Sequence, residues 1–243
     1  MRRTKIICTM GPATDNEDVL RDLMLNGMDV ARLNFSHGSH EEALERINRI
    51  KKVRDELNIP VAILLDTKGP EVRIKDFKEG KVELKEGQKF TLCTDDVVGD
   101  ENQVSITYAN LPNDVKVGSK ILIDDGLIEM EVISVKNSKI LCKVKNGGVV
   151  SNKKGVNVPN VALSMPYMSQ KDIDDILFGI EQDVDFIAAS FVRTADDIRE
   201  IKTLLRDNGG RDIRIIAKIE NAEGVDNIDD IIRETHGIMV ARG

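Results

Sequence analysis

The stretch Val30-Ala31-Arg32-Leu33-Asn34-Phe35-Ser36-His37-Gly38 combines a buried strand with a cluster of polar groups. The apolar run from Met28 to Leu33 predicts the strand. Residues two apart on a strand point to the same face, so Arg32, Asn34 and Ser36 are expected to share one surface. A guanidinium, an amide and a hydroxyl on one surface favour binding of a phosphate and a cation. The alternative is a strand that simply leaves the core for a polar loop.

The segments before and after this stretch alternate short apolar runs with helical periodicity. The apolar runs predict strands buried on both faces, at 6–10, 30–33, 61–65, 186–189, 213–219 and 238–241. Helices are predicted at 15–26 and 39–58, and others beginning at Ser169, Thr194 and about Gly224. Three of them begin with a capping-box pattern, Ser39 with Glu42, Ser169 with Asp172 and Thr194 with Asp197. Repeated strand–helix units predict a parallel sheet, either open or closed into a barrel.

The middle of the chain has a different character. Between 70 and 166, short alternating runs separated by glycines predict small antiparallel strands, and no helix is expected. The sequence therefore predicts three segments: 1–69 as the first part of an α/β domain, 70–166 as an inserted all-β domain, and 167–243 as the α/β domain continued. Such an insertion usually moves as a lid.

Composition restricts the classes of function. The net charge of −7 argues against general affinity for nucleic acid or for anionic membranes, so an anionic substrate needs a local basic pocket or a metal ion. No run approaches the roughly 20 apolar residues of a membrane span. The cysteines, Cys8, Cys93 and Cys142, lie far apart in apolar runs and are expected to be buried and reduced, as in the cytoplasm.

Polar residues collect where the predicted strands end, the usual place for active sites in barrels and open α/β sheets. Lys218 and Glu220 are two apart, so they can face one cavity, with Glu220 holding Mg²⁺ and Lys218 neutralising a transferring phosphoryl group. The alternative is a plain ion pair. Asp66 and Thr67 form an all-oxygen group with Asn34 and Ser36. This group suits a hard cation, unless Asp66 and Thr67 only cap the strand end and turn.

Further motifs bear on whether the chain binds a nucleotide. Lys153-Lys154-Gly155 in the insertion can approach a nucleotide phosphate, whereas the other lysines nearby read as a solvated basic face. Neither a Walker-type loop nor a GxGxxG fingerprint occurs, so neither a P-loop nor a dinucleotide fold is supported.

The motifs resemble those of one family, pyruvate kinase, in the order in which that family has them. The matching segments are 4–13, 31–38, 66–73, 124–126, 154–159, 188–192, 218–221 and 239–243. The resemblance implies a (β/α)₈ TIM barrel, of which this chain has about the first six strands, with a small all-β lid after the third strand. It also implies the last step of glycolysis, transfer of the phosphoryl group of phosphoenolpyruvate to ADP, giving pyruvate and ATP.

The resemblance also implies roles for individual residues. Arg32 and Lys218 are the expected catalytic residues, and with Gly243 they are expected to bind phosphoenolpyruvate. The remaining implied ligands are Asn34, His37, Arg73 and Lys154 for the nucleotide, Glu220 for Mg²⁺ (or Mn²⁺), and Asn34, Ser36, Asp66 and Thr67 for K⁺. Glu71 stands where K⁺-dependent members have glutamate, which predicts K⁺ dependence.

Family members continue with an aspartate after the position of Gly243, and that aspartate is the second Mg²⁺ ligand. We therefore expect these 243 residues to be inactive alone, to associate through the exposed edges of an incomplete barrel, and to form a homotetramer only at full length. Two alternatives stay open: a non-catalytic fragment that binds nucleotides or anions, and a barrel aldolase acting on phosphoenolpyruvate or pyruvate. The lid with Arg73 and Lys154 argues against the aldolase, which has no nucleotide to cover.

Overall fold

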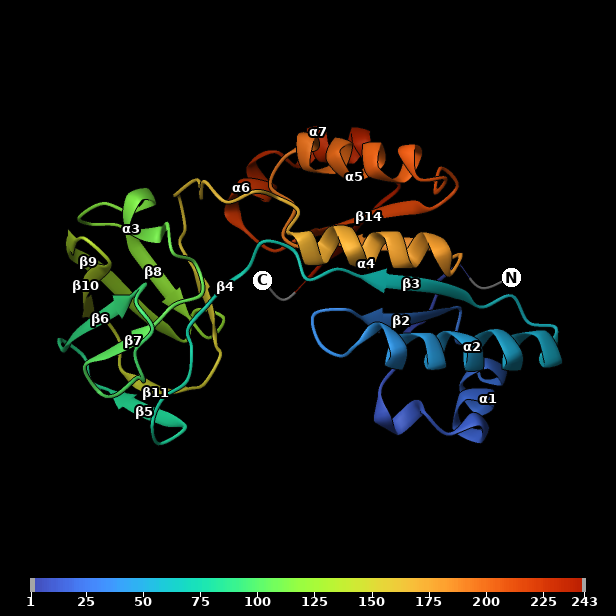
Figure 1. The fold of residues 1–243 in the computed structure, drawn as a ribbon, viewed down its shortest axis with the longest axis horizontal. Helices are drawn as coiled ribbons and strands as arrows, with labels where there is room; N and C mark the ends of the chain where they lie inside the picture. The colour runs from blue at the N-terminus through green and yellow to red at the C-terminus, as the bar shows by residue number, and fades with distance from the viewer. Residues whose placement is uncertain (1–2, 242–243) are drawn as a thin grey trace. The chain divides into compact units, whose positions relative to one another are not determined.

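The computed structural model describes residues 3–241, and its contacts divide them into two units (Figure 1). The first unit holds 3–69, 167–220 and 227–241, and the second holds 70–166 and 221–226. The first unit has a parallel sheet, and the second has sheets that are antiparallel except for one parallel pair of strands. We describe them separately as the barrel unit and the inserted unit.

The sheet of the barrel unit has the order β1-β2-β3-β13-β14-β15, and every neighbouring pair is parallel. Its strands are β1 (Ile7–Thr9), β2 (Val30–Asn34), β3 (Ala62–Asp66), β13 (Phe186–Ala189), β14 (Arg214–Ile219) and β15 (Gly237–Val240). Each predicted strand is present to within a residue or two. Helices follow the strands along the chain, which confirms the α/β class and agrees with the first six strands of a TIM barrel.

Outside residues 70–166, the longer helices begin at short polar side chains, such as Asn16, Ser39 and Ser169. The helices of this part of the chain are α1 (Glu17–Leu25), α2 (His40–Leu57), α4 (Gln170–Glu181), α5 (Ala195–Asp207), α6 (Ala222–Asp226) and α7 (Ile228–Glu234), with a 3₁₀ turn η1 at Pro12–Thr14. Ser169 and Asp172 form the complete capping box that was predicted. At α2 the Ser39 hydroxyl accepts from the Glu42 N–H at 3.3 Å. At α5 the Asp197 carboxylate accepts from the Thr194 N–H at 3.2 Å.

Two details outside residues 70–166 differ from the sequence prediction. Strand β2 ends at Asn34, so Ser36 lies in a turn and does not share a strand face with Arg32 and Asn34. The Asn34 carboxamide accepts the Ser36 N–H at 3.0 Å, which turns the chain away from the sheet. The helix expected from about Gly224 begins earlier and is split into α6 and α7 at Asn227, whose amide donates to the Arg193 carbonyl at 3.0 Å.

Aliphatic side chains fill the core of the barrel unit, as the scarcity of aromatics requires. Helix α2 buries Ala43, Ile47, Ile50 and Val53 along one stripe against the sheet. Cys8 is only half-buried, because β1 lies at the edge of the sheet, whereas Cys93 and Cys142 are buried as expected. All three thiols are free, and burial raises the pKa of Cys142 to about 12.

The inserted unit has a seven-stranded sheet, a two-stranded sheet and a core of its own. Its strands are β4 (Val72–Arg73), β5 (Lys81–Leu84), β6 (Lys89–Cys93), β7 (Gln103–Ser105), β8 (Lys120–Ile123), β9 (Ile128–Lys136), β10 (Lys139–Val144), β11 (Gly148–Ser151) and β12 (Gly155–Asn157). Asp124 and Asp125 both have positive φ in the tight turn between β8 and β9. The expectation of no helix is wrong by one turn, α3 (Leu111–Asp114), which is too short to leave a periodic signal.

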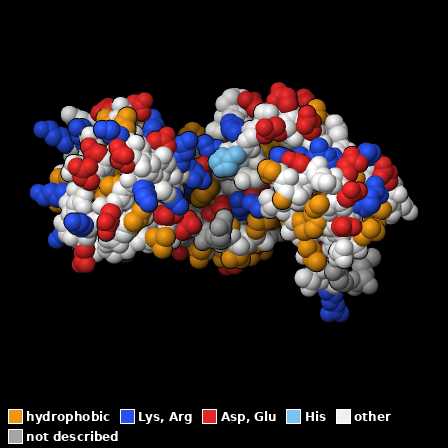
Figure 2. All heavy atoms as spheres, turned by 90° about the horizontal axis from the view of Figure 1, so that it is seen from below, with side chains coloured by type: hydrophobic (Ala, Val, Ile, Leu, Met, Phe, Trp, Pro, Cys, Tyr) orange, Lys and Arg blue, Asp and Glu red, His pale blue; other side chains and the backbone are white. Residues whose placement is uncertain are grey.

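The surface is mixed in charge. Figure 2 shows acidic and basic side chains interspersed over the visible face, in keeping with the modest net charge of −7. Within residues 3–241, no helix has the length and apolarity needed to cross a membrane.

Candidate active site

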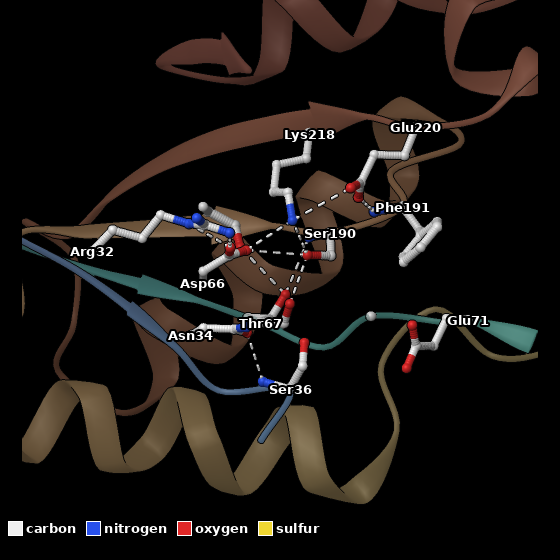
Figure 3. A network of polar contacts seen from close by, with 12 residues as sticks. Arg32, Asn34, Ser36, Asp66, Thr67, Glu71, Ser190, Phe191, Lys218 and Glu220 are labelled. Atoms are coloured by element: carbon white, nitrogen blue, oxygen red, sulfur yellow. Dashed lines mark hydrogen bonds and ion pairs between the residues drawn. The ribbon is translucent and has the colours of Figure 1, made fainter. Parts of the chain in front are cut away.

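The carboxyl ends of four neighbouring strands, β2, β3, β13 and β14, bring polar side chains together (Figure 3). Asn34 at the end of β2 is level with Asp66 on β3, and Asp66 is level with Ala188 on β13. Ser190 and Glu220 come directly after β13 and β14. Parallel strands place these ends at one edge of the sheet, which is why residues far apart in the chain meet there.

Asp66 is the centre of this cluster, with a side chain only 1% exposed. Arg32 donates from Nε to Oδ2 at 2.7 Å, and its Nη2 contacts the same oxygen. Lys218 donates from Nζ to Oδ1 at 3.0 Å. A buried carboxylate requires such compensation, since an unpaired charge away from water is strongly unfavourable. Asp66 therefore holds the two candidate catalytic cations beside each other.

The ammonium group of Lys218 has three oxygen partners. Besides Asp66, its Nζ lies 2.8 Å from the Ser190 hydroxyl and 3.4 Å from Glu220 Oε1. An ammonium has three N–H donors, so these partners fix its position. Two cations, Arg32 and Lys218, and two anions, Asp66 and Glu220, sum to no net charge. A multiply charged phosphate at this cluster thus depends on added metal cations for net attraction.

Ser190 connects the two sides of the cluster, and sequence reasoning assigned it no role. Its hydroxyl donates to the Thr67 carbonyl at 2.6 Å and lies 3.2 Å from Asp66 Oδ1. Its N–H donates to Thr67 Oγ1 at 3.1 Å. The sequence feature that could have identified Ser190 is its position directly after an apolar strand. Thr9, which accepts from Arg32 Nη1 at 2.8 Å, was also missed.

Glu220 accepts a backbone hydrogen bond from Phe191 at 2.8 Å and is 12% exposed. Phe191 has a φ of +55°, a conformation that costs a non-glycine residue roughly 1–3 kcal/mol and persists only where its surroundings enforce it. Such backbone strain is concentrated at functional sites in proteins. The bond leaves further lone pairs of the Glu220 carboxylate for a cation.

The four residues expected to hold K⁺ all offer oxygen atoms, and they come from the ends of β2 and β3 (Figure 3). Asn34 and Ser36 are joined by the backbone hydrogen bond described above. Thr67 is buried, and its hydroxyl donates to the Ala188 carbonyl at 3.3 Å. Both carboxylate oxygens of Asp66 already have cationic partners. A monovalent cation at this group would be held chiefly by neutral oxygens.

No group of three or more His, Cys, Asp or Glu side chains that could hold a metal occurs in residues 3–241. Mg²⁺ commonly binds one or two carboxylates and completes its octahedron with water and substrate oxygens. A single protein carboxylate, such as that of Glu220, is therefore enough for a Mg²⁺ site.

The remaining predicted residues are not part of this cluster. His37 follows β2 and is exposed. In the inserted unit, Arg73 Nη2 is paired with Glu71 at 2.8 Å, a contact that raises the pKa of the guanidinium, and Lys154 Nζ pairs with Asp124 at 2.9 Å. Whether either cation meets a nucleotide stays a prediction. Gly243 lies outside the described residues.

Comparison with known proteins explains why this cluster occurs on a partial barrel. The family model described as "Pyruvate kinase, barrel domain" matches residues 1–243, the whole chain. The chain belongs to the pyruvate kinase family. It is 54% identical over 244 residues to a protein named pyruvate kinase from Geobacillus stearothermophilus. The match covers the whole of this chain and 42% of that relative.

Further relatives carry the same name. The chain is 50% identical to a pyruvate kinase of Clostridium perfringens and 51% identical to one of Staphylococcus haemolyticus, in each case over its whole length. It covers 52% and 42% of these relatives, so it spans about half the length of the curated pyruvate kinases that it matches. The match confirms the family and the partial TIM barrel that the motifs implied.

Proposed function

We propose that this chain supplies the phosphoryl-transfer site of a pyruvate kinase, which converts phosphoenolpyruvate and ADP to pyruvate and ATP. The observation that carries the proposal is the joint contact of Arg32 and Lys218 with the buried Asp66 carboxylate, next to Glu220. Phosphoryl transfer depends mostly on positioning and on neutralising charge on the phosphoryl oxygens. Two cations held at one point meet that requirement without a protein nucleophile.

Arg32 and Lys218 have separate tasks in this proposal. The Arg32 side chain is 28% exposed, so its guanidinium can bind the phosphoryl oxygens of phosphoenolpyruvate from the mouth of the site. Lys218 is only 10% exposed and is held by three oxygens, which suits it to neutralise charge on the phosphoryl group during transfer. Its preorganisation reduces the reorganisation required in the transition state. Gly243 would bind the same substrate.

Glu220 would hold Mg²⁺ or Mn²⁺, and that ion supplies charge neutralisation when it is bound. Asn34, Ser36, Asp66 and Thr67 would hold K⁺. Both assignments agree with the cluster's lack of net charge, which leaves bound cations to attract an anionic substrate. Arg73 and Lys154 of the inserted unit, together with Asn34 and His37, would contact the nucleotide.

Coupled turnover of phosphoenolpyruvate and ADP tests this function. The assay uses the 243-residue chain and a completed chain, in which these residues are continued with the C-terminal remainder of the Geobacillus stearothermophilus relative. We expect turnover with Mg²⁺ in the completed chain only, and much faster with K⁺ than with Na⁺, because of Glu71. Turnover by the 243 residues alone would contradict the expectation that they are inactive.

Failure of the completed chain would favour one of the two other functions. Binding of ADP or of phosphoenolpyruvate without turnover, measured by calorimetry, would indicate a non-catalytic binding protein. Cleavage or condensation of pyruvate would indicate an aldolase. Light scattering on the same samples tests two further proposals, a tetramer for the completed chain and association of the 243 residues through β1 and β15, where Ile7 and Val240 are exposed.

A further inference from the structure

One peptide group at the site, between Ser190 and Phe191, is hydrogen-bonded on both sides. The Tyr167 hydroxyl donates to its carbonyl, Ser190 O, at 3.0 Å. Its N–H, which belongs to Phe191, donates to Glu220 Oε2 at 2.8 Å. A continuous chain of donors and acceptors thus runs from the Tyr167 phenol, through one peptide plane, to the candidate metal ligand.

Tyr167 is suited to act only as a donor in this chain. It is 5% exposed, and burial raises the pKa of its hydroxyl well above the ordinary tyrosine value. The hydroxyl therefore keeps its proton at any pH at which the protein is used. Its ring also lies 5.9 Å from the guanidinium carbon of Arg193, so packing and the hydrogen bond are two separable contributions.

The conformation of the peptide explains why it needs to be held. Phe191 has its backbone in the left-handed region, at a φ of +55°, and such a residue relaxes unless its neighbours prevent it. The hydrogen bonds to Tyr167 and Glu220 hold this peptide at its carbonyl and at its N–H, respectively. The same Ser190 also supplies the hydroxyl that receives Lys218 Nζ at 2.8 Å. A shift of this peptide would displace Glu220 and Lys218 together.

We propose that Tyr167 is a positioning residue, which orients the Glu220 carboxylate for its metal ion through the Ser190–Phe191 peptide. Bonds in such a chain polarise one another, so the phenol also makes the Phe191 N–H a stronger donor to Glu220. This inference rests on the proposed function, because it takes Glu220 as a metal ligand. It adds a residue that neither the motifs nor the strand-end pattern singled out.

Metal affinity gives the first test. Tyr167→Phe keeps the ring and its contact with Arg193 and removes only the hydroxyl. Tyr108→Phe is the matched control, since Tyr108 is the other tyrosine of the chain and its hydroxyl donates to Asp114 in the inserted unit. Electron paramagnetic resonance of free Mn²⁺ gives the dissociation constant in the completed chain. We expect roughly three- to tenfold weaker binding for Tyr167→Phe, the size of one net hydrogen bond, and less than a twofold change for Tyr108→Phe.

A merely structural role for Tyr167 gives a different result. It would lower the melting temperature of Tyr167→Phe and leave the Mn²⁺ dissociation constant unchanged, and that outcome would overturn the proposal. Kinetics add a second discrimination. The KM for Mg²⁺ should rise in Tyr167→Phe while the KM for ADP stays within twofold of the parent.

The hydrogen-bond chain can also be observed in the 243-residue protein without metal or turnover. Labelling with ¹⁵N-phenylalanine gives an amide signal for each of six residues, and Phe191→Leu identifies the one at the site. We expect the Phe191 amide proton to move upfield in Tyr167→Phe, because its bond to Glu220 weakens, and to stay in place in Tyr108→Phe. An unmoved Phe191 signal would refute the coupling even if the kinase activity is confirmed.

A measurement on the unmutated sequence covers the case in which Tyr167→Phe does not fold. Incorporation of 3-fluorotyrosine gives the 243-residue chain two ¹⁹F signals, which Tyr108→Phe assigns and which are then located among the signals of the completed chain. Addition of Mg²⁺ to the completed chain should move the Tyr167 signal and not that of Tyr108. Absence of any response, in a sample that turns over phosphoenolpyruvate, would overturn the positioning role and leave the proposed function standing.

Discussion

The cations of the barrel unit and those of the inserted unit are held in different ways. Lys218 and Arg32 meet at Asp66, a buried carboxylate that is 152 and 34 residues away from them in the chain. Arg73 pairs with Glu71 only two residues away, and the side chains of Arg73 and Lys154 are 35% and 36% exposed. One buried carboxylate holds both cations of the barrel site, whereas Arg73 and Lys154 each have a separate acidic partner and are more exposed to water. The cations of the inserted unit can therefore exchange partners with a ligand at lower cost.

The largest expected effect separates the two kinds of cation by activity. Lys218→Met in the completed chain should lower kcat by about 10²–10³-fold, the loss typical when one preorganised electrostatic group is removed. Lys154→Met is the matched change in the inserted unit, and we expect it mainly to raise the KM for ADP, by roughly tenfold or less. Equal losses of kcat in both variants would show that the two cations do not differ in role.

The free energy of unfolding also distinguishes the buried cluster from the exposed pairs of the inserted unit. Asp66→Asn leaves Arg32 and Lys218 without their buried anion, so it should lower the free energy of unfolding by about 3 kcal/mol in urea melts. Asp124→Asn removes a partly exposed partner of Lys154 at a position with φ of +56°, which asparagine tolerates. Its expected cost is below about 1 kcal/mol. A cost for Asp66→Asn as small as this would mean that the buried cluster is not held as the geometry indicates.

Two glycines extend the comparison to the backbone. Gly69 has a φ of +68°, and a Cβ there would lie 2.6 Å from the Ser190 carbonyl oxygen, the atom that Tyr167 also binds. Gly80 of the inserted unit has a similar φ of +75° and nothing within 4 Å of its Cβ position. Gly80→Ala should cost about 1 kcal/mol from the backbone conformation alone. Gly69→Ala should cost roughly 2–3 kcal/mol and also weaken Mn²⁺ binding; equal costs would exclude the close approach to Ser190.

The smallest effect is expected at Glu71. Glu71→Gln removes the carboxylate whose hydrogen bond raises the pKa of Arg73, but glutamine keeps an oxygen that can accept the same bond from the 35% exposed guanidinium. We expect a change of about 0.5 kcal/mol or less in unfolding free energy, and a loss of the advantage of K⁺ over Na⁺ in turnover. An unchanged preference for K⁺ would contradict the inference drawn from Glu71.

Prediction from sequence succeeded where the signal was local and periodic. The strands around Ala31, Ile63 and Ile187 were found because residues buried on both faces of a parallel sheet leave continuous apolar runs. It was wrong at Ser36, which follows the end of the strand in a turn, and at α3, whose single turn is too short to leave a periodic signal. The contact of Tyr167 with the Ser190 carbonyl left no local signal, because a tyrosine after a proline is equally typical of a core and of a loop.

The order of strands and helices, the strand-rich character of 70–166 and, through the motifs, the family could be predicted from the amino-acid sequence. These depend on periodicity, capping and side-chain chemistry within short windows of the chain. Three features became visible in the folded chain alone: which strand ends meet, the pairing of both Arg32 and Lys218 with Asp66, and the peptide that links Tyr167 to Glu220. This is because those contacts join residues that lie between 23 and 152 positions apart in the chain. Their geometry is set by sheet register and burial, which no local pattern records.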